Sequence, residues 1–149
     1  MKVVIQRVSQ ASVTINDKIK SSIKKGLLIL LGITPGDTQE DIDWLTRKII
    51  GLRIFSDEEG AMNRSVVDVD GDILVISQFT LYAATKKGNR PSFMAAAKPE
   101  IAIPLYEDFL NTLSRKLQKP IYSGEFGADM KVNLLNDGPV TMVMDTKNK

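Results

Sequence analysis

The feature that most constrains the fold is an apolar run from Leu27 to Ile33, interrupted only by Gly32. Successive side chains on a strand point to opposite faces of a sheet, so a strand that is apolar at every position must be covered on both faces. The run is also far too short to span a membrane. We therefore predict a central strand over residues 27–33, with other strands beside it.

Strand patterns precede and follow this run. Segments rich in β-branched and aromatic residues predict further strands over 2–8, 12–15, 19–23, 72–83, 129–135 and 140–144. Asn16-Asp17 predicts a turn. Val66, Val67 and Val69 lead into Asp70-Gly71, which favours a hairpin before the strand at residue 72.

Two stretches carry apolar residues at helical spacing. The first covers about 38–52 and can be capped by Asp37 or Thr38. The second begins at Pro99 and ends at Pro120. Because strands and helices do not alternate, we predict a single α+β domain over 1–149, with a mixed or antiparallel sheet and both helices on one side. The last four residues are expected to be frayed.

Histidine and cysteine are absent from the chain. Their absence excludes Ser-His-Asp triads, cysteine nucleophiles, imidazole bases and cysteine zinc sites. An enzyme with this sequence must therefore activate water or substrate without imidazole. The chain has 20 basic and 18 acidic residues, a net charge of +2. A nucleic-acid site would therefore have to be a local patch.

The first ten residues, MKVVIQRVSQ, lack the apolar core of a signal peptide, and no apolar run approaches membrane-spanning length. We expect a cytoplasmic protein with no membrane partner.

Ser77-Gln78-Phe79-Thr80 places polar side chains in an apolar strand pattern, where Gln78 and Thr80 would share one face. An edge strand with one solvated face explains the pattern. The functional alternative is a ligand site at a strand end, with hydroxyls and backbone N–H groups facing the ligand.

Asn136-Asp137-Gly138-Pro139 is typical of a hairpin turn. However, proline provides no N–H for such a turn, and a Gly-Pro bond can be cis. The functional alternative is a rigid turn whose carbonyls point in one direction.

Two further segments also have two explanations. Lys86-Lys87-Gly88-Asn89-Arg90 is either a solvated loop or a phosphate-binding loop. Residues 124–130 are either an irregular entry into a strand or the wall of a pocket for a flat base.

Taken together, these segments resemble the D-aminoacyl-tRNA deacylase family. The resemblance runs from Met1 to about Met144 and is carried by Gln6-Arg7-Val8, Ser77-Gln78-Phe79-Thr80-Leu81, Arg90-Pro91-Ser92-Phe93, Phe126-Gly127-Ala128-Asp129-Met130 and Asn136-Asp137-Gly138-Pro139-Val140-Thr141. It implies hydrolysis of the ester between a D-amino acid and the terminal ribose of tRNA. It also implies a partly barrel-like sheet, a homodimer with its sites at the subunit interface, and no metal or organic cofactor.

The resemblance also implies roles for individual residues. Gly138 and Pro139 are expected to form a cis element, braced by Arg7, that enters the partner subunit's site. Their carbonyls would exclude an L side chain, so glycyl-tRNA should be hydrolysed as well. The pocket for the terminal adenosine is expected to be lined by Ser77, Gln78, Phe126 and Met130. Candidates for contacts to tRNA phosphates are Lys86, Lys87 and Arg90.

Thr80 is the obvious candidate for a covalent nucleophile, but its hydroxyl needs a base and the chain has no imidazole. We instead expect water to attack, helped by the free ribose hydroxyl. Backbone N–H groups near Phe79 and Thr80 would then stabilise the oxyanion. Two other hypotheses stay open: a non-catalytic tRNA- or RNA-binding module, and a different small-ester hydrolase.

Overall fold

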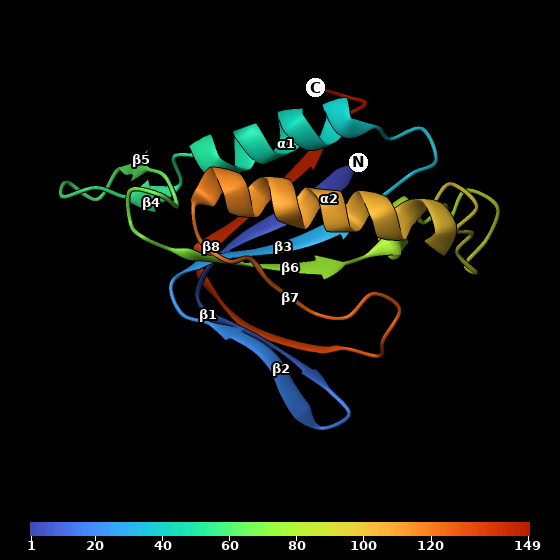
Figure 1. The fold of residues 1–149 in the computed structure, drawn as a ribbon, viewed down its shortest axis with the longest axis horizontal. Coiled ribbons are helices and arrows are strands. Elements are labelled where there is room, and N and C mark those ends of the chain that lie inside the picture. The colour runs from blue at the N-terminus through green and yellow to red at the C-terminus, as the bar shows by residue number, and fades with distance from the viewer.

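The structure, a computed structural model, describes residues 1–149. Its main sheet contains β1 (Lys2–Ile15), β2 (Lys18–Ile23), β3 (Gly26–Gly32), β6 (Asp72–Ser77), β7 (Tyr122–Ser123) and β8 (Lys131–Asp145). β3 pairs in parallel with β6, and β6 with β7, whereas β1 pairs antiparallel with β2, β3 and β8. The predicted mixed sheet is therefore confirmed. A small hairpin of β4 (Phe55–Ser56) and β5 (Met62–Arg64) projects from one end of the molecule (Figure 1).

Both predicted helices are present, and both cover the same face of the sheet (Figure 1). α1 (Gln39–Gly51) begins at Thr38, which forms a capping box with Asp41. α2 (Pro99–Leu117) has Pro99 in its first turn and ends at Gln118. Gln118 takes the left-handed conformation that commonly ends helices, with φ of 58°.

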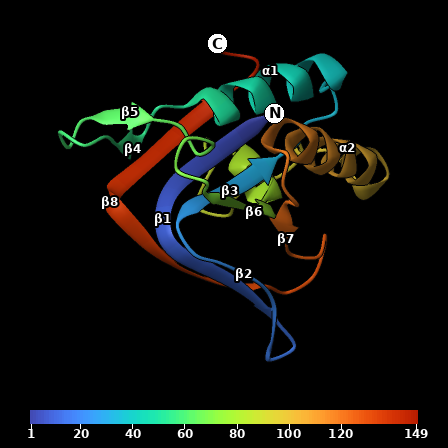
Figure 2. The same cartoon turned by 60° about the vertical axis from the view of Figure 1, so that its left-hand side comes forward.

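The central strand β3 is buried on both faces, as predicted. Its residues Leu27, Ile29 and Leu31 face the helices and join the larger core. Leu28 faces the other way, into a second core of seven buried residues: Val8, Ala11, Val13, Ile23, Leu28, Leu74 and Ile76. β1, β2 and β8 curl around this second core, which gives the sheet its nearly barrel-shaped form (Figure 2).

The predicted strand over 72–83 ends early. β6 stops at Ser77, and Phe79–Tyr82 form a 3-10 helix, η1. Ser77 is the last residue of β6 to pair with β3, because β3 itself ends at Gly32. Gln78 and Thr80 therefore do not share a strand face as expected.

The predicted hairpin at Asp70-Gly71 is also wrong, because residues 66–70 form turns and the preceding strand, β5, pairs with β4 rather than with β6. The side chains of Ser65 and Asp68 accept hydrogen bonds from each other's backbone N–H, at 3.2 and 2.8 Å. Such local bonds compete with strand pairing. Most of the β4–β5 hairpin lies within the polar segment 56–64, for which the sequence predicts no strand.

The hairpin turn weighed for residues 136–139 is not formed. β8 continues through this segment and pairs antiparallel with β1 on both sides of it. Thr141 pairs with Gln6 and Asn136 pairs with Val8, so one residue of β1 faces four of β8. Residues 137–140 are therefore a large β-bulge opposite Arg7, and strands 2–8 and 12–15 are one continuous β1.

The chain end is anchored rather than frayed, because Thr146 and Lys147 contact a buried acidic pair. The Met1 ammonium donates to Asp37 Oδ1 at 2.6 Å and to Thr146 Oγ1 at 2.7 Å. Lys147 Nζ lies 2.9 Å from Asp41 Oδ2. Burial alone would raise the pKa of the Asp41 carboxyl. Hydrogen bonds from the side chains of Thr146 and Lys147 and from the Thr38 N–H outweigh burial and hold that pKa well below its usual range.

Candidate functional site

The C-terminal end of β6 opens into η1, where polar groups meet two hollows. The Gln78 N–H donates to the Leu31 carbonyl at 2.7 Å, which fixes the chain where it leaves the sheet. The first N–H groups of a helix have no acceptor within it. In η1 the Leu81 N–H bonds to the Gln78 carbonyl, so the first such groups are those of Phe79 and Thr80. The side chain of Thr80 is exposed and accepts a hydrogen bond from Gln78 Nε2.

Two hollows share Ser77, Gln78, Phe79 and Gly127 as walls. The first, of about 390 Å³, is mainly apolar and is closed by Leu31, Ile33, Ala97, Ala102 and Phe126. The second, of about 620 Å³, is bounded by Ile76, Ala128, Asp129, Met130 and Val132. Asp129 is the only ionisable residue among the walls, and it is exposed and ion-paired with Lys131. The hollows thus offer apolar surface, hydroxyl and backbone groups rather than an acid–base pair.

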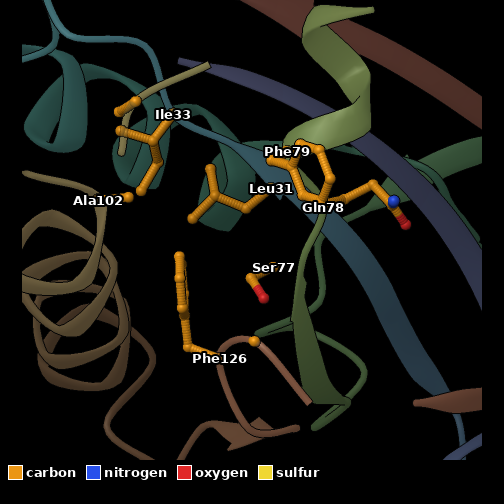
Figure 3. A pocket seen from close by; sticks show the side chains of 9 residues that line it. Leu31, Ile33, Ser77, Gln78, Phe79, Ala102 and Phe126 are labelled. Atoms are coloured by element: carbon orange, nitrogen blue, oxygen red, sulfur yellow. The ribbon is translucent and has the colours of Figure 1, made fainter. Parts of the chain in front are cut away.

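Aromatic contacts hold the walls in place. Phe126 lies across the first hollow from Leu31, with Ser77 beside them, whereas the Gln78 side chain points away (Figure 3). The Phe126 ring packs edge-on against Tyr106, with centroids 5.7 Å apart. Burial raises the pKa of the Tyr106 hydroxyl to about 12, so it stays neutral and donates to the Val75 carbonyl. The Phe79 ring, which is 54% exposed, packs edge-on against Phe93.

Gly124 leaves the space that the Met130 side chain occupies beside the second hollow. A Cβ built on Gly124 would lie 2.3 Å from the Met130 sulfur. Residues 124–130 therefore contribute a wall to the second hollow. An irregular entry into a strand does not by itself account for this arrangement.

The bulge at residues 137–140 is held by a buried arginine. Arg7 Nε donates to the Asp137 carbonyl at 3.1 Å, and Arg7 Nη1 donates to the Ile54 carbonyl at 2.6 Å. The Asn136 amide donates to the carbonyls of Arg7 and Val140, both at 3.0 Å. The Gly138–Pro139 peptide bond is cis, and both residues are exposed. Arg7 therefore does brace the bulge.

Within one chain, the bulge and the hollows lie apart. Arg7 pairs with Leu27 on β3, and Leu27 pairs with Ile73 on β6. Ile73 comes four residues before Ser77 on the same strand. Strand rise and spacing then put Gly138 roughly 15–20 Å from Ser77. The structure thus brings together Ser77, Gln78, Phe79, Thr80, Phe126 and Met130, but not Arg7, Gly138 and Pro139.

The basic loop follows η1 and is tied at its base by the Ala84–Ser92 bridge. Lys86, Lys87 and Arg90 are exposed, and none of them forms an ion pair. They are therefore available to an anionic ligand near the exposed Phe79 ring and its half-buried neighbour Phe93.

Several wall residues were not predicted from the sequence. Leu31, Ile33, Ala97 and Ala102 line the first hollow, yet each belongs to an apolar pattern that equally fits a closed core. No sequence signal separates the two situations. No helix of the structure has the length and apolar character needed to cross a membrane.

The family model described as D-Tyr-tRNA(Tyr) deacylase matches residues 4–145. A protein of Bacteroides thetaiotaomicron and one of Flavobacterium johnsoniae, both named D-aminoacyl-tRNA deacylase, are 67% and 66% identical to this chain over 149 residues. Each alignment covers 100% of this chain and 99% of the relative. A solved structure described as c-Myc DNA Unwinding Element Binding Protein superposes on this chain with a TM-score of 0.93 at 43% sequence identity. The superposition covers 98% of this chain and 99% of the chain in that structure.

A second solved structure, described as a probable eukaryotic D-amino acid tRNA deacylase, superposes with a TM-score of 0.82 at 18% sequence identity. This superposition covers 96% of this chain and 97% of the chain in that structure. That likeness concerns the fold alone. The family match and the full-length relatives decide the assignment: the chain belongs to the D-Tyr-tRNA(Tyr) deacylase family.

Proposed function

We propose that the chain hydrolyses the ester bond of D-aminoacyl-tRNA and so removes D-amino acids from tRNA before translation. The observation that carries the proposal is the meeting of two hollows at the first turn of η1. One hollow is apolar and suits a base, and the turn between them offers backbone N–H groups. The substrate places this activity in the cytoplasm, where tRNA is charged and used.

Selectivity for the D configuration would come from the bulge of a second copy. Because Gly138 and Pro139 are exposed and remote from the hollows of their own chain, they can act only on another subunit's substrate. Carbonyls of the bulge would face the α-carbon there and leave no room for an L side chain. Discrimination by a clash does not require contacts to the favoured side chain, so different D-amino acids would be accepted.

The outer edge of β8 supports a homodimer. β8 pairs only with β1, so its other edge has unpaired backbone groups along a long strand. Leu135 and Val143 on this strand are 57% and 72% exposed. Long exposed apolar edge strands are aggregation hazards unless another chain covers them. A second copy that covers β8 would also bring the bulge toward the neighbouring hollows.

In the proposed reaction, water attacks the ester carbonyl with help from the free ribose hydroxyl. The N–H groups of Phe79 and Thr80 would donate to the developing oxyanion, a contribution worth about 3–4 kcal/mol per donor in other enzymes. The alcohol of the terminal ribose leaves, and the free D-amino acid is released. No metal or organic cofactor takes part. Ser77 and Gln78 belong to the same turn and hold its shape.

The terminal adenosine would occupy the hollows, with its base against Phe126 and Met130. The phosphates before it would meet Lys86, Lys87 and Arg90, because phosphate contacts fix the position of a nucleic acid without recognising its sequence.

Replacing Thr80 by alanine is expected to lower kcat by no more than about tenfold, because its backbone N–H remains while its hydroxyl is not the nucleophile. Loss of a covalent nucleophile would instead cost a factor of about a million, as seen in serine proteases. Single-turnover deacylation measures the difference. Isolation of an acyl ester on Thr80 would overturn the water mechanism.

The test of the function is a panel of D-tyrosyl-, L-tyrosyl- and glycyl-tRNA. We expect hydrolysis of the D and glycyl esters and survival of the L ester, because glycine has no side chain for the bulge to exclude. Intact glycyl-tRNA at high enzyme concentration would contradict exclusion. Hydrolysis of the L ester at the same rate would indicate a general esterase.

A second candidate is a non-catalytic nucleic-acid-binding module. It is favoured by the solved relative at 43% identity, whose description names binding to a DNA element. The same panel separates the two functions, because a binding module would leave all three esters intact while still retarding tRNA in a gel.

A further inference from the structure

A basic groove lies on the outer side of the molecule, away from both hollows. It has a volume of about 870 Å³ and is lined by Trp44, Arg47, Lys48, Gly51, Leu52 and Arg53. Arg47, Lys48 and Arg53 are exposed. The ammonium groups of Lys48 and Lys149 lie 5.8 and 5.0 Å from the centroid of the Trp44 ring.

The cations in this groove, and Lys149 beside it, form no ion pair. None of the eight ion pairs in the structure includes Arg47, Lys48, Arg53 or Lys149. Arg53 bonds only to Asn63, through its carbonyl and its side-chain amide oxygen. Three cations in the groove wall and Lys149 over the Trp44 ring form a local positive field, although the whole chain carries only +2. The combination of cations and an aromatic face suits a nucleic-acid backbone.

The groove is connected to the bulge of β8 through Arg7. Arg53 precedes Ile54, whose carbonyl accepts from Arg7, and Arg7 also bonds the Asp137 carbonyl of the bulge. The C-terminal end of α1 and the bend of β8 lie at the same end of the molecule in both views (Figures 1 and 2). A bulge inserted into another subunit's site would therefore carry this groove to the rim of that site.

We propose that the α1 groove of one subunit binds the phosphate backbone of the tRNA whose 3′ end occupies the partner subunit's pocket. The inference rests on the proposed function and dimer. It assigns a second set of tRNA contacts, in trans, besides the basic loop beside the pocket. Each substrate would then be held by both subunits.

The test compares full-length D-tyrosyl-tRNA with D-tyrosyl-adenosine, which is too short to reach the groove. In the double variant Arg47→Gln/Lys48→Gln we expect kcat/KM for the tRNA, relative to that for the adenosine ester, to fall about tenfold at physiological salt. The dissociation constant for uncharged tRNA should rise by a similar factor. The slope of log Kd against log salt should fall by about 1 for each substituted cation that binds a phosphate in the parent protein.

The matched control is Lys18→Gln/Lys20→Gln, which removes the same charge from exposed positions on β2. Equal effects of the two double variants on tRNA binding would overturn the proposal, because only the overall charge would then matter. If the unmodified protein hydrolyses neither ester, the proposed function fails. The measurements with uncharged tRNA still decide whether the groove binds RNA.

Mixed dimers test the action in trans. One subunit carries Ser77→Phe, which fills its hollows, and the other carries the groove substitutions, so the only open pocket belongs to the groove-deficient subunit. A parental kcat/KM on tRNA, counted per open pocket, supports the proposal. The intact groove then lies on the subunit opposite the open pocket, where the proposal requires it. A tenfold loss would overturn it, as would a monomeric mass in solution. If the Ser77→Phe subunit does not fold, Ala97→Phe replaces it, because it adds a ring to another wall residue of the first hollow.

Discussion

Replacing Gly138 by alanine is expected to lower hydrolysis of D-tyrosyl-tRNA by at least about 100-fold, since displacements of about 1 Å at a catalytic site can cost that much. Gly138 has φ of +127°, a conformation that residues with a Cβ rarely adopt. A Cβ built there would lie 2.9 Å from Arg7 Nη2 and 2.9 Å from Val140 Cγ2. The methyl group would therefore displace both the bulge and the arginine that braces it.

The sequence alone suggests that this substitution acts only by adding a methyl group where the amino acid must sit. The contact with Arg7 adds a second effect, because Arg7 also bonds the Ile54 carbonyl at the end of α1. We therefore expect a moderate loss of stability, about 1–3 kcal/mol, alongside the loss of activity. Single-turnover deacylation, melting temperature and dimer mass separate the two effects.

Gly60→Ala is the matched control. Gly60 has a similarly positive φ of +84°, but nothing lies within 4 Å of a Cβ built there. This variant places a Cβ on a residue with positive φ but displaces no neighbouring atoms. It should therefore hydrolyse D-tyrosyl-tRNA at the rate of the parent protein. A folded Gly138→Ala protein with parental rate and chiral selectivity would remove the bulge from the mechanism.

The elements that local patterns determine could be predicted from the sequence. Both helices follow from apolar spacing and from the residues at their ends, such as Thr38 and Pro99. The central strand β3 follows from an apolar run that only a covered strand can accommodate. In each case the information lies within the segment itself.

Apart from the Asp70-Gly71 hairpin, which local bonds between Ser65 and Asp68 replace, the features whose predictions were wrong depend on distant partners. The end of β6 at Ser77 is set by the length of β3, and the bulge at residues 137–140 is set by pairing of β8 with β1. Lys147 is ordered by Asp41, 106 residues away in the chain. Within the candidate site, the motif residues could be named in advance, but Leu31 and Ala102 could not. Their side chains look the same whether they close a core or line a hollow.

Replacing Asp37 by alanine is expected to lower the free energy of unfolding by about 3–5 kcal/mol, the usual cost of removing one partner from a buried ion pair. The Asp37 side chain and the Met1 ammonium are both fully buried and lie 2.6 Å apart. Asp37 also accepts a hydrogen bond from the Thr34 N–H at 2.9 Å, which shapes the turn before α1. Without the carboxylate, the ammonium keeps only the Thr146 hydroxyl, which cannot neutralise its charge.

Lys147→Ala is the comparison that shows how much the burial of an ion pair contributes to the loss of stability. Lys147 contacts the same acidic pair, 3.3 Å from Asp37 and 2.9 Å from Asp41, but its side chain is 46% exposed. Water screens such a pair, so its removal should cost about 1 kcal/mol or less. Urea unfolding at neutral pH measures both variants, and Asp37→Ala should also lower the melting temperature by roughly 6–20 °C. Equal, small effects of the two substitutions would mean that the Met1–Asp37 pair does not stabilise the fold. Because neither Met1 nor Asp37 lines a hollow or bonds to the bulge, folded Asp37→Ala protein at low temperature should still deacylate D-tyrosyl-tRNA, which separates the loss of stability from a loss of chemistry.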